Sequence, residues 1–225
     1  MTMTQSIRKL TLTTHVTASV GWIGALAVFF AHALAGLLSQ DEQIVRAVSL
    51  AMDITAWFVI LPLGLASFAT GLVQALGTAW GLLRHYWILF KLLLTAVATI
   101  VLLLKLGPIS YLAEEAAKAS LSSADLIGLR TSVMVHAGGG LLVLLTAATL
   151  AVCKPQGMTP YGLRKQREPS NAGKECGPRS VVSTPRWVKV FGIVLVILIL
   201  VVGAMSFLGG HGPGAHIPLT GRGDR

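Results

Sequence analysis

Five long apolar runs constrain this chain more than any other feature of its sequence. Each run is close to the about 20 residues that an α-helix needs to cross a bilayer. Backbone groups find no water inside a bilayer, so such runs form helices that satisfy their own hydrogen bonds. The runs are Leu10–Leu38, Ile54–Leu76, His85–Leu104, Thr131–Val152 and Trp187–Leu208. We therefore predict an all-α membrane protein, with a four-helix transmembrane bundle and a fifth C-terminal transmembrane helix.

The runs divide the chain into four parts. Residues 1–153 are expected to form the four-helix bundle. Residues 154–186 hold five prolines and many basic residues, which is typical of a weakly ordered cytoplasmic linker. Residues 187–208 form the predicted fifth helix, and residues 209–225 a tail rich in glycine with two histidines.

Two prolines interrupt the apolar runs or follow them. Pro62 lies inside the second run, where it is expected to kink the helix, because proline lacks a backbone N–H and membrane helices tolerate this loss. Pro108 follows the third run and is expected to end that helix. The helix-forming residues 111–121 then predict a short separate surface helix.

The basic residues collect on one side of the predicted membrane. With the N-terminus in the cytoplasm, the cytoplasmic segments hold eleven basic and two acidic residues, and the outer segments six basic and seven acidic ones. By the positive-inside rule we expect a multi-pass protein of the cell membrane, with a cytoplasmic N-terminus and an extracytoplasmic C-terminus. The net charge of +9 is then explained by the membrane topology of the chain and by its attraction to the lipid bilayer. Nucleic-acid binding would need a basic folded face instead of a basic loop.

Four histidines lie in or at the edges of the first four spans, where ionisable side chains usually have a partner and often a function. They are His15, His32, His85 and His136. Counted from the charged ends of each span at roughly 1.5 Å per residue, His32 and His136 have similar depths toward the outside. His15 and His85 have similar depths toward the inside. The depths predict two pairs, with His32 and His136 as ligands of haem iron or copper.

Small residues follow three of these histidines at i+3 and i+4, on the same helix face. They are Ala18 and Ser19 after His15, Ala35 and Gly36 after His32, and Gly139 and Gly140 after His136. Such a face leaves room for a haem plane, but it also serves close helix packing. Larger residues follow His85, so it resembles a ligand least. As alternatives, His15 and His85 can reach head groups at the interface, and His32 and His136 can hydrogen-bond across helices without a ligand.

Two basic residues near the inner side are further candidates. Lys91 is the one Lys or Arg well within a predicted span. Its ammonium can snorkel to the inner face, or it can neutralise a carboxylate of a haem or a substrate. The guanidinium of Arg84 can likewise neutralise a carboxylate of a haem or a substrate. The imidazoles of His211 and His216 in the tail could bind copper or zinc, because imidazole suits both metals. Two histidines in a glycine-rich tail more often have no role.

The first three spans carry short motifs of a known group of membrane proteins. They are His15, Trp22 and Gly24 in the first span, Pro62 and Gly71 in the second, and Trp87, Lys91 and Leu92 in the third. Over roughly residues 10–152 the chain resembles small actinobacterial integral membrane proteins and the group of the copper-resistance protein D family and the four-helix membrane protoporphyrinogen oxidases. The resemblance implies a haem ligand at His15 and a functional Lys91. The chain departs from the oxidases in lacking a second histidine at the end of the third span and in adding a fifth span.

Three functions remain open from the sequence. The first is a b-type haem protein that transfers electrons in the membrane, with His32 and His136 as outer ligands, His15 as an inner ligand and His85 as its partner. A quinone or a redox protein would then be its partner. The second is a copper-handling membrane protein that uses the same histidines. The third is a non-catalytic membrane protein whose histidines bridge helices.

The charge asymmetry generates a prediction about topology. A cysteine introduced by Gly214→Cys should react with a membrane-impermeant thiol reagent in intact cells, because the tail is expected outside. Cys176, in the predicted cytoplasmic linker, should react only after the membrane is opened. Labelling of Cys176 in intact cells with protection of the residue-214 cysteine would reverse the topology.

Overall fold

The computed structural model describes residues 4–77, 86–118 and 124–153, together with Thr159 and residues 188–190, 192, 193, 196 and 200. Within them all regular structure is helical. The described elements are α1 (Gln5–Leu38), α2 (Glu42–Thr55), the π-helix η1 (Ala56–Ile60), α3 (Leu61–Gly77), α4 (Tyr86–Ala117) and α5 (Ala124–Cys153).

Four helical segments of this structure are long and apolar enough to cross a membrane. They are Gln5–Leu38, Glu42–Gly77, Tyr86–Ala117 and Leu126–Cys153. The first four predicted spans are therefore confirmed as long apolar helices. The predicted fifth span, the linker 154–186 and the tail 209–225 lie outside the described residues, apart from the few positions named above.

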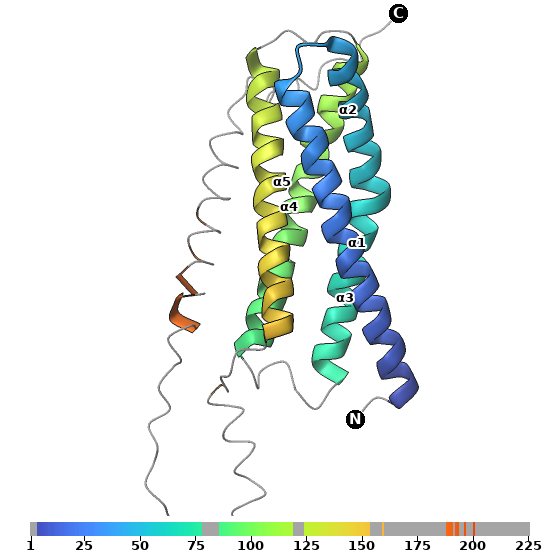
Figure 1. The fold of residues 1–225 in the computed structure, drawn as a ribbon, viewed down its shortest axis with the longest axis vertical. Coiled ribbons are helices and arrows are strands. Elements are labelled where there is room, and N and C mark those ends of the chain that lie inside the picture. Colours follow the sequence, from blue (N-terminus) through green and yellow to red (C-terminus); the bar gives the residue numbers. More distant parts are fainter. Residues whose placement is uncertain are drawn as a thin grey trace, which may run out of the picture.

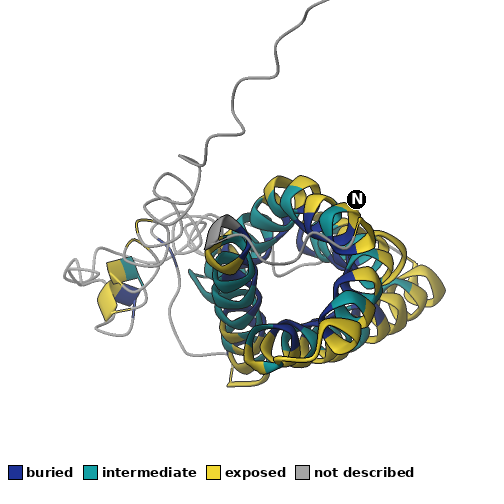
Figure 2. Ribbon diagram, turned by 90° about the horizontal axis from the view of Figure 1, so that it is seen from above, coloured by how far each residue is buried: buried dark blue, intermediate teal, exposed yellow. Residues whose placement is uncertain are grey.

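The helices run up and down and form a ring (Figures 1 and 2). The segment α2–η1–α3 packs against both α1 and α4, and α5 packs against both of them from the other side. As a result α1 and α4 face each other across the ring. We call the end where α1 begins the Gln5 end of the bundle, and the end where α1 stops the Leu38 end.

The second span is one continuous helical segment with a π-turn in its middle. Asp41 caps its start, since its carboxylate oxygen accepts a hydrogen bond from the Gln43 N–H at 2.8 Å. In η1 the Leu61 N–H reaches back five residues to the Ala56 carbonyl. This wider turn comes directly before Pro62, which has no N–H to donate. Buried Ala56 and Ile60 face the core from this segment.

The prediction that Pro108 ends the third span is wrong. The helix α4 continues through Pro108 to Ala117, and residues 111–117 belong to it instead of to a separate surface helix. Proline removes one hydrogen bond, a loss that a membrane helix tolerates. Residues on one face of this extension are buried against the core and hold the helix in place. They are Leu106, Ile109, Leu112, Ala113 and Ala116.

Asp53, on α2, is held by a hydrogen-bonded connection to α4. The Ser110 hydroxyl donates to the Asp53 carboxylate at 2.6 Å. The Trp57 indole N–H donates to the same hydroxyl at 3.0 Å. A carboxylate at this position would be costly without donors, so these bonds stabilise the contact between the second and third spans.

Large side chains of α1 pack directly on glycines of the neighbouring helices. A Cβ atom built on Gly64 would lie 3.1 Å from the Trp22 indole, and one on Gly138 would lie 3.0 Å from the Phe30 ring. Helices in lipid associate through such close packing, because the hydrophobic effect gives little preference for a neighbouring helix over lipid. Glycine is therefore required at these positions for space.

This packing predicts that Gly64→Ala destabilises the bundle. The added methyl group would overlap the Trp22 indole, and overpacking of this kind costs about 1–3 kcal/mol. The matched control is Gly24→Ala on α1, where a Cβ would meet no atom within 4 Å. Thermal unfolding of the purified variants in one detergent measures both. Equal stability of the two variants would contradict the packing argument.

Candidate functional site

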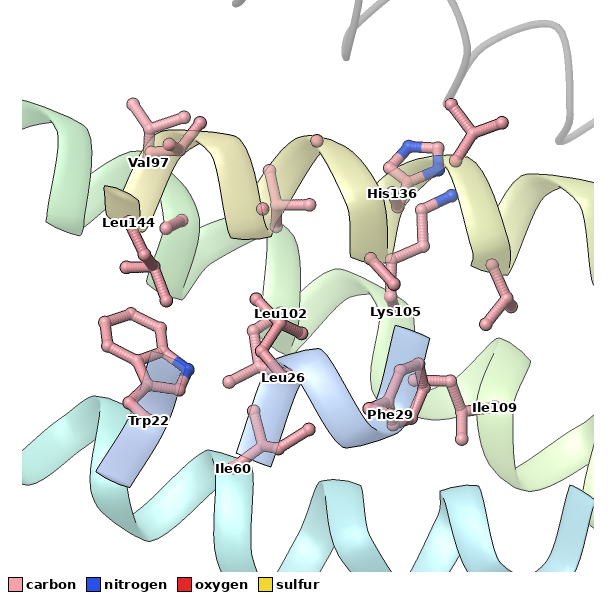
Figure 3. A pocket seen from close by; sticks show the side chains of 18 residues that line it. Trp22, Leu26, Phe29, Ile60, Val97, Leu102, Lys105, Ile109, His136 and Leu144 are labelled. Carbon is pink, nitrogen blue, oxygen red and sulfur yellow. The ribbon is translucent and has the colours of Figure 1, made fainter. Parts of the chain in front are cut away.

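A cavity of about 130 Å³ lies inside the Leu38 half of the bundle. Its lining comes from α1, η1, α4 and α5 (Figure 3). Trp22 lies at one end of the cavity and His136 at the other. Almost all lining residues are apolar, and the titratable ones are His136 and Lys105. Val97 on α4 and Val135 on α5 line the cavity and are half-buried.

His136 lines this cavity, and one of its two ring nitrogens has no hydrogen-bond partner among the described residues. Its side chain is 9% exposed. Its Nδ1 lies 2.7 Å from the Ser132 carbonyl oxygen one turn earlier. A carbonyl only accepts, so Nδ1 carries the proton and Nε2 keeps a lone pair. Nε2 is buried and has no hydrogen-bond partner in the part of the chain that the structure describes. Buried polar atoms normally have a partner, so this acceptor is a candidate ligand-binding atom.

Lys105 is the charged residue of this cavity. Its side chain extends from α4, is half-buried and lies beside the His136 imidazole in Figure 3. In the sequence Lys105 directly follows the third predicted span, His85–Leu104. Because α4 continues to Ala117, Lys105 lies well inside the helix instead. The cavity therefore combines a neutral imidazole acceptor and an ammonium donor in apolar surroundings.

The predicted outer pair of histidines is not joined by a hydrogen bond. His32 is half-buried on α1 and is not part of the cavity lining. Its Nδ1 is buried without a partner among the described residues. The contact that the structure shows near His136 is with Lys105 on the neighbouring helix.

His15 lies in a second polar cluster, in the Gln5 half of the bundle. Its side chain is 6% exposed. Nδ1 lies 3.0 Å from the Ser67 carbonyl oxygen and 3.1 Å from the Thr70 hydroxyl, both on α3. Nε2 lies 3.0 Å from the Lys91 ammonium nitrogen on α4. Both ring nitrogens are therefore engaged. His85 and Arg84, the other predicted inner residues, lie outside the described residues.

The small residues beside the histidines have different roles. A Cβ on Gly139 would meet no atom within 4 Å, whereas one on Gly140 would approach Leu26 at 3.3 Å. Near His15, Ala18 is buried, and the Ser19 hydroxyl lies 2.7 Å from the Ser67 hydroxyl. Of these four residues Gly139 borders open space, and the other three serve packing or hydrogen bonding. Small residues beside His136 are thus compatible with a ligand, and those beside His15 hold helices together.

Ser67 and Thr70 were not singled out from the sequence, although they carried a signal. They are hydroxyl residues three positions apart in an apolar run, and the glycine beside them, Gly71, leaves space for an imidazole. A Cβ on Gly71 would lie 3.0 Å from His15 Cε1. Polar residues that share a helix face in a membrane span indicate a partner on the facing helix.

Metal binding by three or more side chains is not indicated in the described ranges. They contain no group of at least three His, Cys, Asp or Glu residues that could hold an ion. Comparisons of the chain with protein-family models, curated proteins and solved structures find no match. The function of the chain is therefore inferred from the geometry around His15 and His136.

Proposed function

We propose that this chain is a multi-pass membrane protein that holds a redox-active group in the cavity faced by His136 and transfers electrons within the membrane. One observation carries the proposal. The His136 Nε2 atom is buried and has no partner among the described residues, and the His136 side chain lines an apolar cavity. A buried acceptor without a partner costs about 1–3 kcal/mol. A ligand that bonds to Nε2 would remove this cost.

Haem b is the first candidate for this group. Metal-binding histidines usually donate their other ring N–H to a carbonyl or carboxylate, as His136 does to Ser132. Gly139 borders open space on the same helix face, and Lys105 could pair with a propionate. A bound haem would supply one-electron redox chemistry through its iron. The donor atom thus fits haem, with a single described histidine at the cavity in place of the predicted pair.

The size of the cavity sets a condition on haem binding. Pockets for cofactors commonly measure about 300–1,000 Å³, and this cavity holds about 130 Å³. A macrocycle would therefore require α4 and α5 to separate. The half-buried Val97 and Val135 border the seam between these helices, so this is the side on which the cavity can widen.

A quinone head group is the second candidate, and the cavity volume favours it. An engineered apolar cavity of about 150 Å³ holds one benzene ring, which is close to the volume observed here. The Lys105 ammonium could donate to a quinone oxygen, while His136 Nε2 could accept from the hydroxyl of a quinol. Such a ligand is lipid-soluble and could enter between α4 and α5.

The two other functions have less support. Imidazole is a good copper ligand, but His136 is the one histidine that lines this cavity. The function in which histidines only bridge helices fits His15, which joins α1 to α3 and α4 by hydrogen bonds. It does not suit His136, whose Nδ1 hydrogen bond is to Ser132 on its own helix.

The proposal predicts that His136→Ala removes the bound redox group. Protein purified from its own membranes into lipid nanodiscs should show either a Soret band or extractable quinone at a stoichiometry near one per chain. The His136→Ala variant should contain at most about one tenth of the haem or quinone that the wild type holds, because it loses the ligating atom. His32→Ala is the matched control, since it removes an in-span histidine outside the cavity lining and should leave the content unchanged.

The two candidates are separated by the same samples. A Soret band identifies haem, and quinone without a Soret band identifies the smaller ligand. Wild-type protein that holds neither group would reject the proposed function. Equal loss in both variants would show that the effect of residue 136 is structural and not specific to the cavity.

A further inference from the structure

The second polar cluster contains a half-buried positive charge that lacks a negative partner among the described residues. The Lys91 ammonium crosses the ring from α4 and donates to His15 on α1. Within the described ranges the one ion pair joins Lys118 to Glu115, so no carboxylate of these residues contacts Lys91. Charged side chains in membrane spans are costly and are usually paired. The cluster therefore lacks the negative charge that normally accompanies such a lysine.

His15 cannot supply that negative charge. Its Nδ1 faces the Ser67 carbonyl, which only accepts, so Nδ1 carries the proton. The Thr70 hydroxyl has its own acceptor, the Ala66 carbonyl at 2.6 Å, and can therefore accept from Nδ1 as well. Nε2 is left as an acceptor for the Lys91 ammonium. The imidazole is a neutral support that positions the ammonium without compensating its charge.

The support is rigid. His15 is buried, and it fits against Gly71, where a Cβ would lie 3.0 Å from its ring. Its bonds to α3 fix the ring orientation. A lysine near the end of a span normally extends toward water, but here its nitrogen is held 3.0 Å from a residue on the opposite helix. Lys91 is thus held toward the interior of the bundle.

The ammonium also has donors to spare and a side from which it can be reached. An ammonium has three N–H groups, and among the described residues the Lys91 ammonium is hydrogen-bonded to His15. The Lys91 side chain is half-buried. Lys91 lies five residues after Tyr86, where α4 begins at the Gln5 end of the bundle. A small negatively charged group can approach from this end.

We propose that Lys91, positioned by His15, binds an oxyanion at the Gln5 end of the bundle. The chemistry is that of a carboxylate or phosphate oxygen, which accepts charge-assisted hydrogen bonds from an ammonium. The oxyanion can be a free ion or the head group of an anionic lipid. This site is separate from the cavity at His136 and does not depend on the proposed redox function.

The test uses the full-length protein in phosphatidylcholine nanodiscs. Three additions are compared: phosphatidylglycerol in the bilayer, soluble acetate, and inorganic phosphate, each against sodium chloride of equal ionic strength. The first readout is the ¹⁵N resonance of the Lys91 side chain, identified by its absence in Lys91→Met. The second is the melting temperature. A response to phosphatidylglycerol alone identifies a lipid, and a response to acetate or phosphate identifies a free ion.

We expect the Lys91 resonance to be that of an ammonium and to shift on addition of the oxyanion. The melting temperature of the wild type should rise by about 2–4 °C, and that of Lys91→Arg should also rise, because arginine keeps the charge. Lys91→Met should show no rise. Lys9→Met is the matched control, because it removes an exposed charge at the same end and should respond like the wild type.

His15→Gln separates the positioning role from charge alone. It keeps the charge of Lys91 and removes the imidazole support, so the oxyanion should bind at least about tenfold more weakly, the loss typical when a positioning partner is removed. Three results would each overturn the proposal. They are a Lys91 resonance that does not move with any addition, a neutral amine at neutral pH, and equal loss of response in Lys9→Met and Lys91→Met. The first two need only the wild type and the assignment of its resonance.

Discussion

The absence of water inside a bilayer is the constraint on which this structure depends. Each polar group in a span must find its partner within the protein. Within the helices the backbone N–H and C=O groups are hydrogen-bonded to one another. Threonine hydroxyls donate to backbone carbonyls one turn earlier on their own helix. They include Thr11, Thr95, Thr99, Thr131, Thr146 and Thr149. Against this background a polar atom without a partner is informative, and His136 Nε2 is one of three in the described residues.

The helix α1 connects the two polar regions of the bundle. In the Gln5 half His15 joins it to α3 and α4 by hydrogen bonds. In the middle Trp22 packs on Gly64 and forms one end of the cavity. Toward the Leu38 end the facing residues are apolar up to His136 and Lys105. The interior thus changes along the axis from a hydrogen-bonded crossing to an apolar cavity.

Both polar regions combine a histidine with a lysine, but the state of the imidazole differs. In each, a backbone carbonyl accepts from Nδ1 and leaves Nε2 as an acceptor. At His15 the lysine occupies this acceptor, so the imidazole positions an ammonium. At His136 the acceptor is buried and has no partner among the described residues. The same side-chain chemistry therefore supports a ligating atom in one place and a positioned charge in the other.

Sequence alone determined the number and the approximate extent of the four described spans, because apolar length is a local property that a bilayer selects for. It also identified His15, His136 and Lys91 as residues that need an explanation, since polar groups in lipid are costly. It failed at Pro108, because the burial of the residues that follow is a property of packing and not of local propensity. It also missed Lys105 as a cavity residue for the same reason.

The partner of each histidine was decided only by the tertiary structure. Counting along a helix estimates depth, but it does not say which helices face each other or toward which neighbour a side chain turns. Depth related His15 to His85, which lies outside the described residues, and the ring of helices brings His15 to Lys91 on the opposite side. The estimate of depth also paired His32 with His136. In the structure His136 lines the cavity beside Lys105, and His32 is not part of the lining. Helix packing sets these orientations, and packing depends on side chains far apart in the chain.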